Sequence, residues 1–214
     1  MKTESMAHIP NSTEPERHEL LASYHQFLER INIHSADIEN RWSEQLTCQQ
    51  GCSGCCHRDL SVFPIEAERI RRYLEKHELR PLAVVSPPPI TREALTVLDL
   101  EGQAPCAMLD SHGLCRIYEA RPTICRSHGL PLAVEDDDGV YGDVCPLSFD
   151  GGAGLVDVPG DDFLSLQTVN TVLAALNQQF VQRTGAEPER VSLETLARES
   201  ERKLSSPIES PGFD

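Results

Sequence analysis

Apolar residues recur every three or four positions in the first part of the chain, which is the spacing of an amphipathic helix. Thr13 and Glu16 have the spacing of a capping box, and Pro15 suits a first helical turn. A break between Asn32 and Ser35 is compatible with the pattern. We expect a helical segment over 13–46 that packs on the cysteine-rich part of the chain or on a second copy. Its apolar stripe comprises Leu20, Leu21, Tyr24, Phe27, Leu28, Ile31, Ile38, Trp42 and Leu46.

Further helices are indicated by the same periodicity together with start and stop residues. Pro64 opens one helix, and a short helix is expected over 91–100. In the C-terminal part, Asp161 can cap a helix that ends near Gly185, and Ser192 can start another. Helices are therefore expected on both sides of the middle of the chain.

Two segments favour short β-hairpins, because apolar residues flank a polar turn in each of them. The first spans 105–118 and turns at 110–113, and the second turns at Asp138 and Gly139. The glycine-rich stretch 151–154 is interpreted as a flexible link, since it lacks the strand and helix that surround a phosphate-binding loop. These elements predict an α+β fold that is predominantly helical.

Composition and charge exclude two classes of function. Lysine and arginine number 19 and aspartate and glutamate 34, so the formal net charge is −15, and such a chain repels nucleic-acid phosphates. No apolar run approaches the roughly 20 residues of a transmembrane helix. The first ten residues show no secretory signal. We expect a cytoplasmic monomer or homodimer that binds no nucleic acid and no membrane, with a protein partner left open.

The chain has 8 cysteines, all between residues 48 and 145. In a reducing cytoplasm, thiols crowded in this way bind metal more often than they form disulfides. Four lie within nine residues of one loop, two lie on the arms of the first hairpin, and two flank the second. Four disulfides, or buried thiols without a metal, are the alternatives. The candidate metal ligands are Cys48, Cys52, Cys55, Cys56, Cys106, Cys115, Cys125 and Cys145.

Thiolates suit zinc or an iron–sulfur cluster better than hard cations. Eight thiolates could form two four-cysteine zinc sites, one larger cluster, or one cluster beside structural thiols. The side chains of adjacent Cys55 and Cys56 diverge, so one of them is expected to serve a second metal, bridge two metals or stay free. His57, His112 and His128 lie near cysteines and are alternative ligands, although satisfied or exposed histidines are commoner.

Arginines also lie close to the cysteines in sequence. A metal held by several thiolates has a net negative charge, which these arginines would offset in an already acidic chain. The alternative is that they only keep the surface soluble. They are Arg58, Arg116, Arg121 and Arg126.

The order of the cysteines resembles that of a known family. It runs Cys48-x3-Cys52-x2-Cys55-Cys56, then Pro105-Cys106, then Cys115-Arg116-Ile117-Tyr118-Glu119-x-Arg121-Pro122-x2-Cys125-Arg126. This pattern resembles the YkgJ-type cysteine cluster family, also called the CxxCxxCC zinc- or iron-chelating domain. The resemblance covers about residues 48–145 and implies a small, mostly bacterial, cytoplasmic chelating protein. A related cysteine region in the flagellin lysine methylase is associated with an iron–sulfur cluster, which favours iron.

We therefore expect a protein that holds an iron–sulfur cluster or zinc through thiolates, with a redox or electron-transfer role. The alternatives are a cluster-dependent enzyme, through methyl transfer or S-adenosylmethionine chemistry, and a metallochaperone that hands metal to a partner. A non-enzymatic role is favoured, and no residue is assigned to catalysis. The expected architecture is a small cysteine-rich metal-binding core with two short β-hairpins, flanked by N- and C-terminal helices. The expected divisions are a flexible N-terminus (1–12), an N-terminal helical segment (13–46), the cysteine-cluster metal-binding domain (47–149), C-terminal helices packing on the core (150–204) and a disordered tail (205–214).

Overall fold

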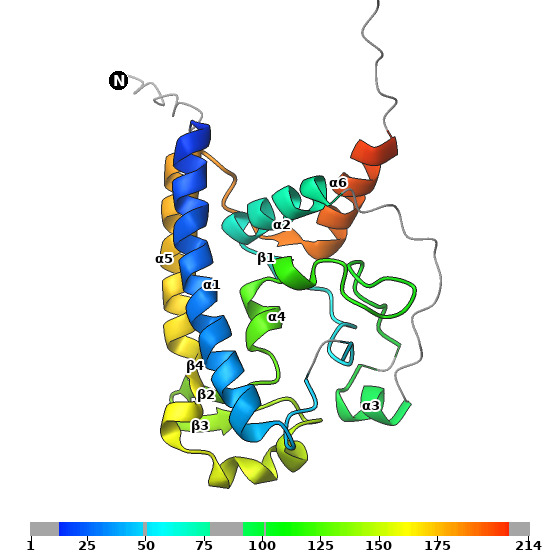
Figure 1. The fold of residues 1–214 in the computed structure, drawn as a ribbon, viewed down its shortest axis with the longest axis vertical. Helices are drawn as coiled ribbons and strands as arrows, with labels where there is room; N and C mark the ends of the chain where they lie inside the picture. Colours follow the sequence, from blue (N-terminus) through cyan, green and yellow to red (C-terminus); the bar gives the residue numbers. More distant parts are fainter. Residues whose placement is uncertain (1–12, 49–50, 78–91, 101, 206–214) are drawn as a thin grey trace, which may run out of the picture.

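The structure is a computed structural model whose described part is predominantly helical, with a few short strands in two small sheets (Figure 1). The expected α+β class is therefore confirmed. No helix in this described part is both long enough and apolar enough to cross a membrane. The predicted flexible N-terminus (1–12) lies outside the described residues. The predicted disordered tail (205–214) also lies outside them, apart from Ser205. The structure describes residues 13–48, 51–77, 92–100 and 102–205.

Helix α1 (Glu14–Trp42) is continuous, without the break that the sequence left open between Asn32 and Ser35. The predicted capping box is present, and the Thr13 N–H donates to a Glu16 carboxylate oxygen at 2.9 Å. One face of α1 is buried, as the spacing predicted. The buried residues are Leu20, Tyr24, Leu28, Ile31 and Ile38.

Helix α1 lies along α5 (Leu166–Thr184), and Figure 1 shows these two long helices side by side. Leu20, Tyr24 and Leu28 of α1 pack with Leu173 and Phe180 of α5. The same cluster includes one residue of α2 (Pro64–Lys76), and α4 (Thr123–Ser127) also contacts α1. The apolar stripe of the N-terminal segment is thus covered largely by the C-terminal helix and partly by the cysteine-rich segment.

The start of α5 differs from the prediction. Asp161 does not cap this helix, because residues Gly160–Asp162 form a separate 3-10 turn and Leu164–Ser165 form strand β4. The N-cap is Ser165, whose hydroxyl oxygen accepts a hydrogen bond from the Thr168 N–H at 3.2 Å. The helix ends at Gly185 as predicted, in the left-handed conformation common at helix C-termini.

A second core lies between α2 and α6 (Leu193–Ser205). Strand β1 (Ser61–Val62) precedes α2 and pairs antiparallel with β5 (Val191–Ser192), which precedes α6. Cys106 and Cys115 are partly buried and pack against this core. The apolar contacts between α2 and α6 therefore support part of the cysteine-rich segment. The buried residues of this core are Val62, Ala67, Ile70, Leu74, Met108, Ile117, Ala120, Leu193, Leu196 and Ala197.

The two predicted hairpins form to different extents. Strands β2 (Leu132–Asp136) and β3 (Gly139–Asp143) pair antiparallel as expected, and β4 adds to β2 in a parallel arrangement that the sequence did not predict. The first hairpin has only one bridge, between Leu109 and Cys115. The remaining helical elements are α3 (Arg92–Val97) and the 3-10 turns η1 (Tyr118–Ala120) and η2 (Phe149–Asp157).

Candidate metal centre

A small cavity of about 60 Å³ collects most of the cysteines. The loop before β1, the first hairpin and α4 all contribute thiols to its wall, and apolar side chains complete it. All eight cysteines of the chain are free thiols. The cysteines that line the cavity are Cys48, Cys52, Cys55, Cys56, Cys106, Cys115 and Cys125.

Backbone contacts hold these separate stretches together. The Cys106 N–H donates to the Cys56 carbonyl oxygen at 2.7 Å, which joins the first hairpin to the cysteine loop. The Cys48 thiol donates to the His128 carbonyl oxygen at 3.4 Å, which joins the same loop to the end of α4. Gly129 has a φ of 96°, and a Cβ there would lie 2.4 Å from the Cβ of Cys48. The close approach of these two chain segments therefore requires glycine.

Helix α4, which carries Cys125, is anchored by a buried carboxylate that the sequence analysis did not single out. Glu66 is only 3% exposed. Its Oε1 accepts hydrogen bonds from the Tyr24 hydroxyl at 3.2 Å and the Thr123 N–H at 2.9 Å, and its Oε2 accepts from the Phe63 N–H at 2.9 Å. Glu66 thus connects α1, α2 and α4. The sequence signal for it is a glutamate at the third position of α2, from which its carboxylate accepts the N–H of the N-cap residue Phe63.

Cys145 differs from the other cysteines because it does not line the cavity. It is buried with Leu98, Leu100 and Leu147. It lies near the cavity nevertheless, because the His128 imidazole interacts with both the Cys145 and the Cys55 thiols. Hydrogen bonding to Cys145, and then to Cys55, raises the pKa of His128 to about 10.

The thiols differ in how readily they ionise. Burial raises the pKa of Cys48 to about 12, and it also raises the pKa of Cys125. Hydrogen bonding to Cys56, assisted by His128, lowers the pKa of Cys55, while the same pair raises the pKa of Cys56. We expected the side chains of the adjacent Cys55 and Cys56 to diverge. Both nevertheless line the cavity, and they share a hydrogen bond. Cys55 is the thiol whose thiolate form is favoured before any metal binds.

The three candidate histidines have different surroundings. His112 lies in the turn of the first hairpin, where its backbone N–H donates to Asp110 Oδ1 at 2.8 Å. His57 and His128 have buried ring nitrogens, Nδ1 and Nε2 respectively, without a hydrogen-bond partner in the described part of the chain. Buried polar atoms are normally satisfied. Of the three histidines only His128 lines the thiol cavity, where its ring lies beside the Cys145 and Cys55 thiols.

The donor set and the size of the cavity fit a thiolate metal centre. Thiolates and imidazole are the ligands of zinc and of iron–sulfur clusters. The cavity is small, with a volume of about 60 Å³. No group of three or more His, Cys, Asp or Glu side chains among residues 13–48, 51–77, 92–100 and 102–205 already has the arrangement of a metal site.

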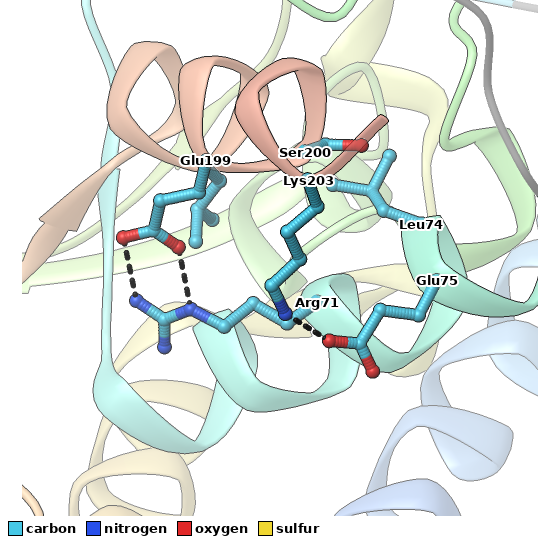
Figure 2. A pocket seen from close by; sticks show the side chains of 7 residues that line it. Arg71, Leu74, Glu75, Glu199, Ser200 and Lys203 are labelled. Carbon is cyan, nitrogen blue, oxygen red and sulfur yellow. Dashed lines mark hydrogen bonds and ion pairs between the residues drawn. The ribbon is translucent and has the colours of Figure 1, made fainter. Parts of the chain in front are cut away.

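A larger cavity of about 180 Å³ lies between α2 and α6, apart from the thiols. Figure 2 shows that charged side chains of the two helices cross it. Arg71 Nε lies 2.8 Å from Glu199 Oε2, and Lys203 forms an ion pair with Glu75. These charges satisfy one another, and no residue of this wall also lines the thiol cavity. The α2–α6 cavity is therefore part of a helix–helix contact.

Comparison with known protein families agrees with the geometry. Residues 47–146 match the family model CxxCxxCC, whose description is "Putative zinc- or iron-chelating domain". The matched range contains all eight cysteines. Searches of curated proteins and of solved structures found no similar protein. Over residues 47–146, which are 100 of its 214 residues, this chain is thus similar to the CxxCxxCC family of zinc- or iron-chelating domains.

Proposed function

We propose that the thiol cavity binds zinc or an iron–sulfur cluster through cysteine thiolates. The observation that carries this proposal is the convergence of seven thiols, from three separate stretches of chain, on one cavity of about 60 Å³. A single buried cysteine can be an ordinary small apolar residue. Apolar packing does not explain seven cysteines around one cavity, because larger aliphatic side chains would bury more apolar surface at the same positions.

The chain's own residues have three tasks in this proposal. The seven cavity cysteines supply thiolates, with His128 and Cys145 beside them as further donors. Leu60, Met108 and Ile117 on the wall exclude water from the sulfur atoms. The hydrogen bond from Cys106 to Cys56 and the contact between Cys48 and Gly129 keep the three stretches in register. Because ligands from distant stretches meet only in the folded chain, metal binding also stabilises the fold.

A redox or electron-transfer role is the finer part of the proposal, and it requires an iron–sulfur cluster. One structural zinc takes four ligands. Seven thiols exceed that number, which supports either a cluster with neighbouring thiols or more than one ion. A bound cluster would supply one-electron chemistry.

Metal analysis of anaerobically purified protein tests the proposal. We expect a fixed ratio of zinc or iron to protein, with a brown colour and visible absorption if the metal is an iron–sulfur cluster. Bleaching of that absorption by a chemical reductant, with recovery on reoxidation, would support the redox role. Absence of stoichiometric zinc and iron would contradict metal binding, and colourless zinc protein would contradict the redox role alone.

Two cysteine variants and a matched control locate the centre. C52S changes the cysteine loop and C125S changes α4, so both should lose most of the bound metal. M108L alters another buried residue of the same wall without removing a thiol, and it should keep the metal. Circular dichroism monitors folding. Unchanged metal content in both cysteine variants would place the metal elsewhere.

A further inference from the structure

A second, polar cavity of about 140 Å³ lies directly beside the thiol cavity. Its outer wall comes from α1 and includes Asn32, Ser35 and Glu39. The two cavities are adjacent because five residues line both of them. The shared residues are Cys48, Tyr118, Arg121, Cys125 and His128.

Arg126 lines the polar cavity but is held by its neighbours. Its Nε donates to the Arg121 carbonyl oxygen at 2.9 Å and its Nη1 to Asn32 Oδ1 at 2.8 Å. Its Nη2 donates to the Glu119 carbonyl oxygen at 2.5 Å. All three nitrogens of this guanidinium therefore have acceptors, and Arg126 contributes mainly its positive charge.

Arg121 is different because its terminal nitrogens have no partner within the part of the chain that the structure describes. Its guanidinium carbon lies 3.6 Å from the centroid of the Tyr118 ring, and its Nε donates to the Tyr118 carbonyl oxygen at 3.1 Å. These contacts fix the guanidinium in place. Neither Nη1 nor Nη2 has a hydrogen-bond partner among the residues that the structure describes. Arg121 thus presents two oriented NH2 groups on a wall that it shares with the thiols.

Several guanidinium groups gather here, although Glu39 also lines the polar cavity. Arg69 also donates to the Glu119 carbonyl oxygen, at 2.6 Å, so two guanidinium groups meet at one acceptor. Arg121 adds a third guanidinium group, since it lines the same polar cavity as Arg126. In the described part of the chain, no carboxylate forms an ion pair with any of these three arginines. This concentration of positive charge is notable in a chain with a net charge of −15.

We propose that the polar cavity binds a small oxyanion, a carboxylate or a phosphate, between Arg121 and the edge of the thiol cavity. A planar guanidinium fork matches the two oxygens of such a group. A volume of about 140 Å³ corresponds to roughly five water molecules, which suits a group of a few heavy atoms. The position of the anion beside a metal rests on the proposed function, whereas its binding to Arg121 does not.

This arrangement gives the thiol centre a side from which a ligand can approach. Cys48, Cys125 and His128 separate the two cavities, so an anion on Arg121 would lie next to these candidate metal ligands. A purely structural centre has no need of such a cavity. The proposed metal centre would therefore have a small anionic substrate or effector.

Anion titrations of the purified protein test the inference. Sodium acetate and sodium phosphate are added separately to ¹⁵N-labelled protein, with sodium chloride at matched ionic strength as the reference. We expect saturable shifts of the amide signals of Ser35, Gly129 and Leu130, which line the cavity. Tighter binding of acetate indicates a carboxylate ligand, and tighter binding of phosphate indicates a phosphate ligand. Shifts no larger than those with chloride would overturn the inference.

Variants of Arg121 test the anchor. Loss of a charge-assisted pair of hydrogen bonds should make R121Q bind the anion about tenfold more weakly or worse. R121K keeps the charge without the planar fork and should be intermediate. R198Q removes the same charge from the exposed face of α6 and should bind like the wild type. Equal affinity in R121Q and R198Q would exclude Arg121 as the anchor.

Metal content, measured on the same samples, separates this inference from the proposed function. Wild-type protein that binds the anion but contains no metal would refute the metal centre and leave the anion site standing. Metal-loaded protein without anion binding would refute the anion site alone. C52S should lose metal yet retain anion binding, because Cys52 does not line the polar cavity.

Discussion

Replacing Gly129 by alanine gives the sharpest test of how the thiol cavity is assembled. The added Cβ would lie 2.4 Å from the Cβ and 2.8 Å from the Sγ of Cys48. Carbon atoms in contact prefer about 3.5–4.0 Å, so Cys48 would have to move by about 1 Å or more. The residue would also keep a φ of 96°, which side-chain-bearing residues rarely adopt.

The magnitude follows from these two effects. A positive φ costs roughly 1–2 kcal/mol for a residue with a Cβ, and overpacking a buried contact adds about 1–3 kcal/mol. We expect G129A to lower the free energy of unfolding by about 2–5 kcal/mol, which corresponds to a fall in Tm of roughly 5–15 °C for a chain of this size. Because Cys48 would be displaced from the cavity wall, bound metal should also decrease.

The matched control is G185A at the end of α5. Gly185 has a φ of 65°, and nothing lies within 4 Å of the position of its Cβ. This variant therefore has the backbone strain without the steric contact, and it should lose about 1 kcal/mol and keep its metal. Urea unfolding and metal analysis of both variants measure the difference. If G129A is no less stable than G185A and holds a full complement of metal, the Cys48–Gly129 contact does not shape the site.

Four further predictions concern the framework and the thiols. E66A removes the acceptor of the Phe63 and Thr123 N–H groups and leaves the Tyr24 hydroxyl with only the Thr123 hydroxyl as a partner, so it should lower stability by about 3–5 kcal/mol in urea unfolding. E66Q retains an oxygen acceptor and should lose less. W42F removes the 2.8 Å hydrogen bond from the Trp42 indole to the buried Asp162 carboxylate and should lower the free energy of unfolding by about 1–3 kcal/mol. An unchanged midpoint of urea unfolding would show that this hydrogen bond contributes nothing. Burial raises the pKa of Cys48 from 9.0 to about 12, so in this pH range the thiol ionises in the unfolded chain before it ionises in the folded one. The metal-free, reduced protein should therefore lose stability as the pH rises through this range. A urea midpoint that does not change with pH would contradict the burial of the protonated thiol. Bound metal should show the opposite dependence and be lost as the pH falls, because protons compete for the thiolates, and a chelator competition at several pH values measures this.

Local chemistry made several elements predictable. The capping box at Thr13, Pro64 at the start of α2 and Gly185 at the end of α5 each act within one turn of the chain. The turn at Asp138 and Gly139 likewise predicted the pairing of β2 with β3. These signals depend on neighbouring residues, so the sequence contains them completely.

Other parts of the fold could not be predicted because they depend on contacts between distant residues. Leu132 pairs with Leu164 in a parallel arrangement across 32 positions of chain, and no local pattern specifies it. That pairing, with the 3-10 turn before it, moved the start of α5 from Asp161 to Ser165. The sequence also did not specify which segment packs on the apolar face of α1, because an apolar face indicates that it is buried but not against which part of the chain.

The amino-acid sequence by itself determined the chemistry of the site: eight thiols in a spacing that matches a family of zinc- or iron-chelating domains. Only the tertiary structure decided which thiols meet, placing seven around one cavity and Cys145 behind His128. It also singled out Arg121 from the arginines near the cysteines, because whether a guanidinium is satisfied depends on acceptors from elsewhere in the chain. Spacing along a chain limits how far apart two side chains can be, whereas their actual separation is set by the packing of all the segments between and around them.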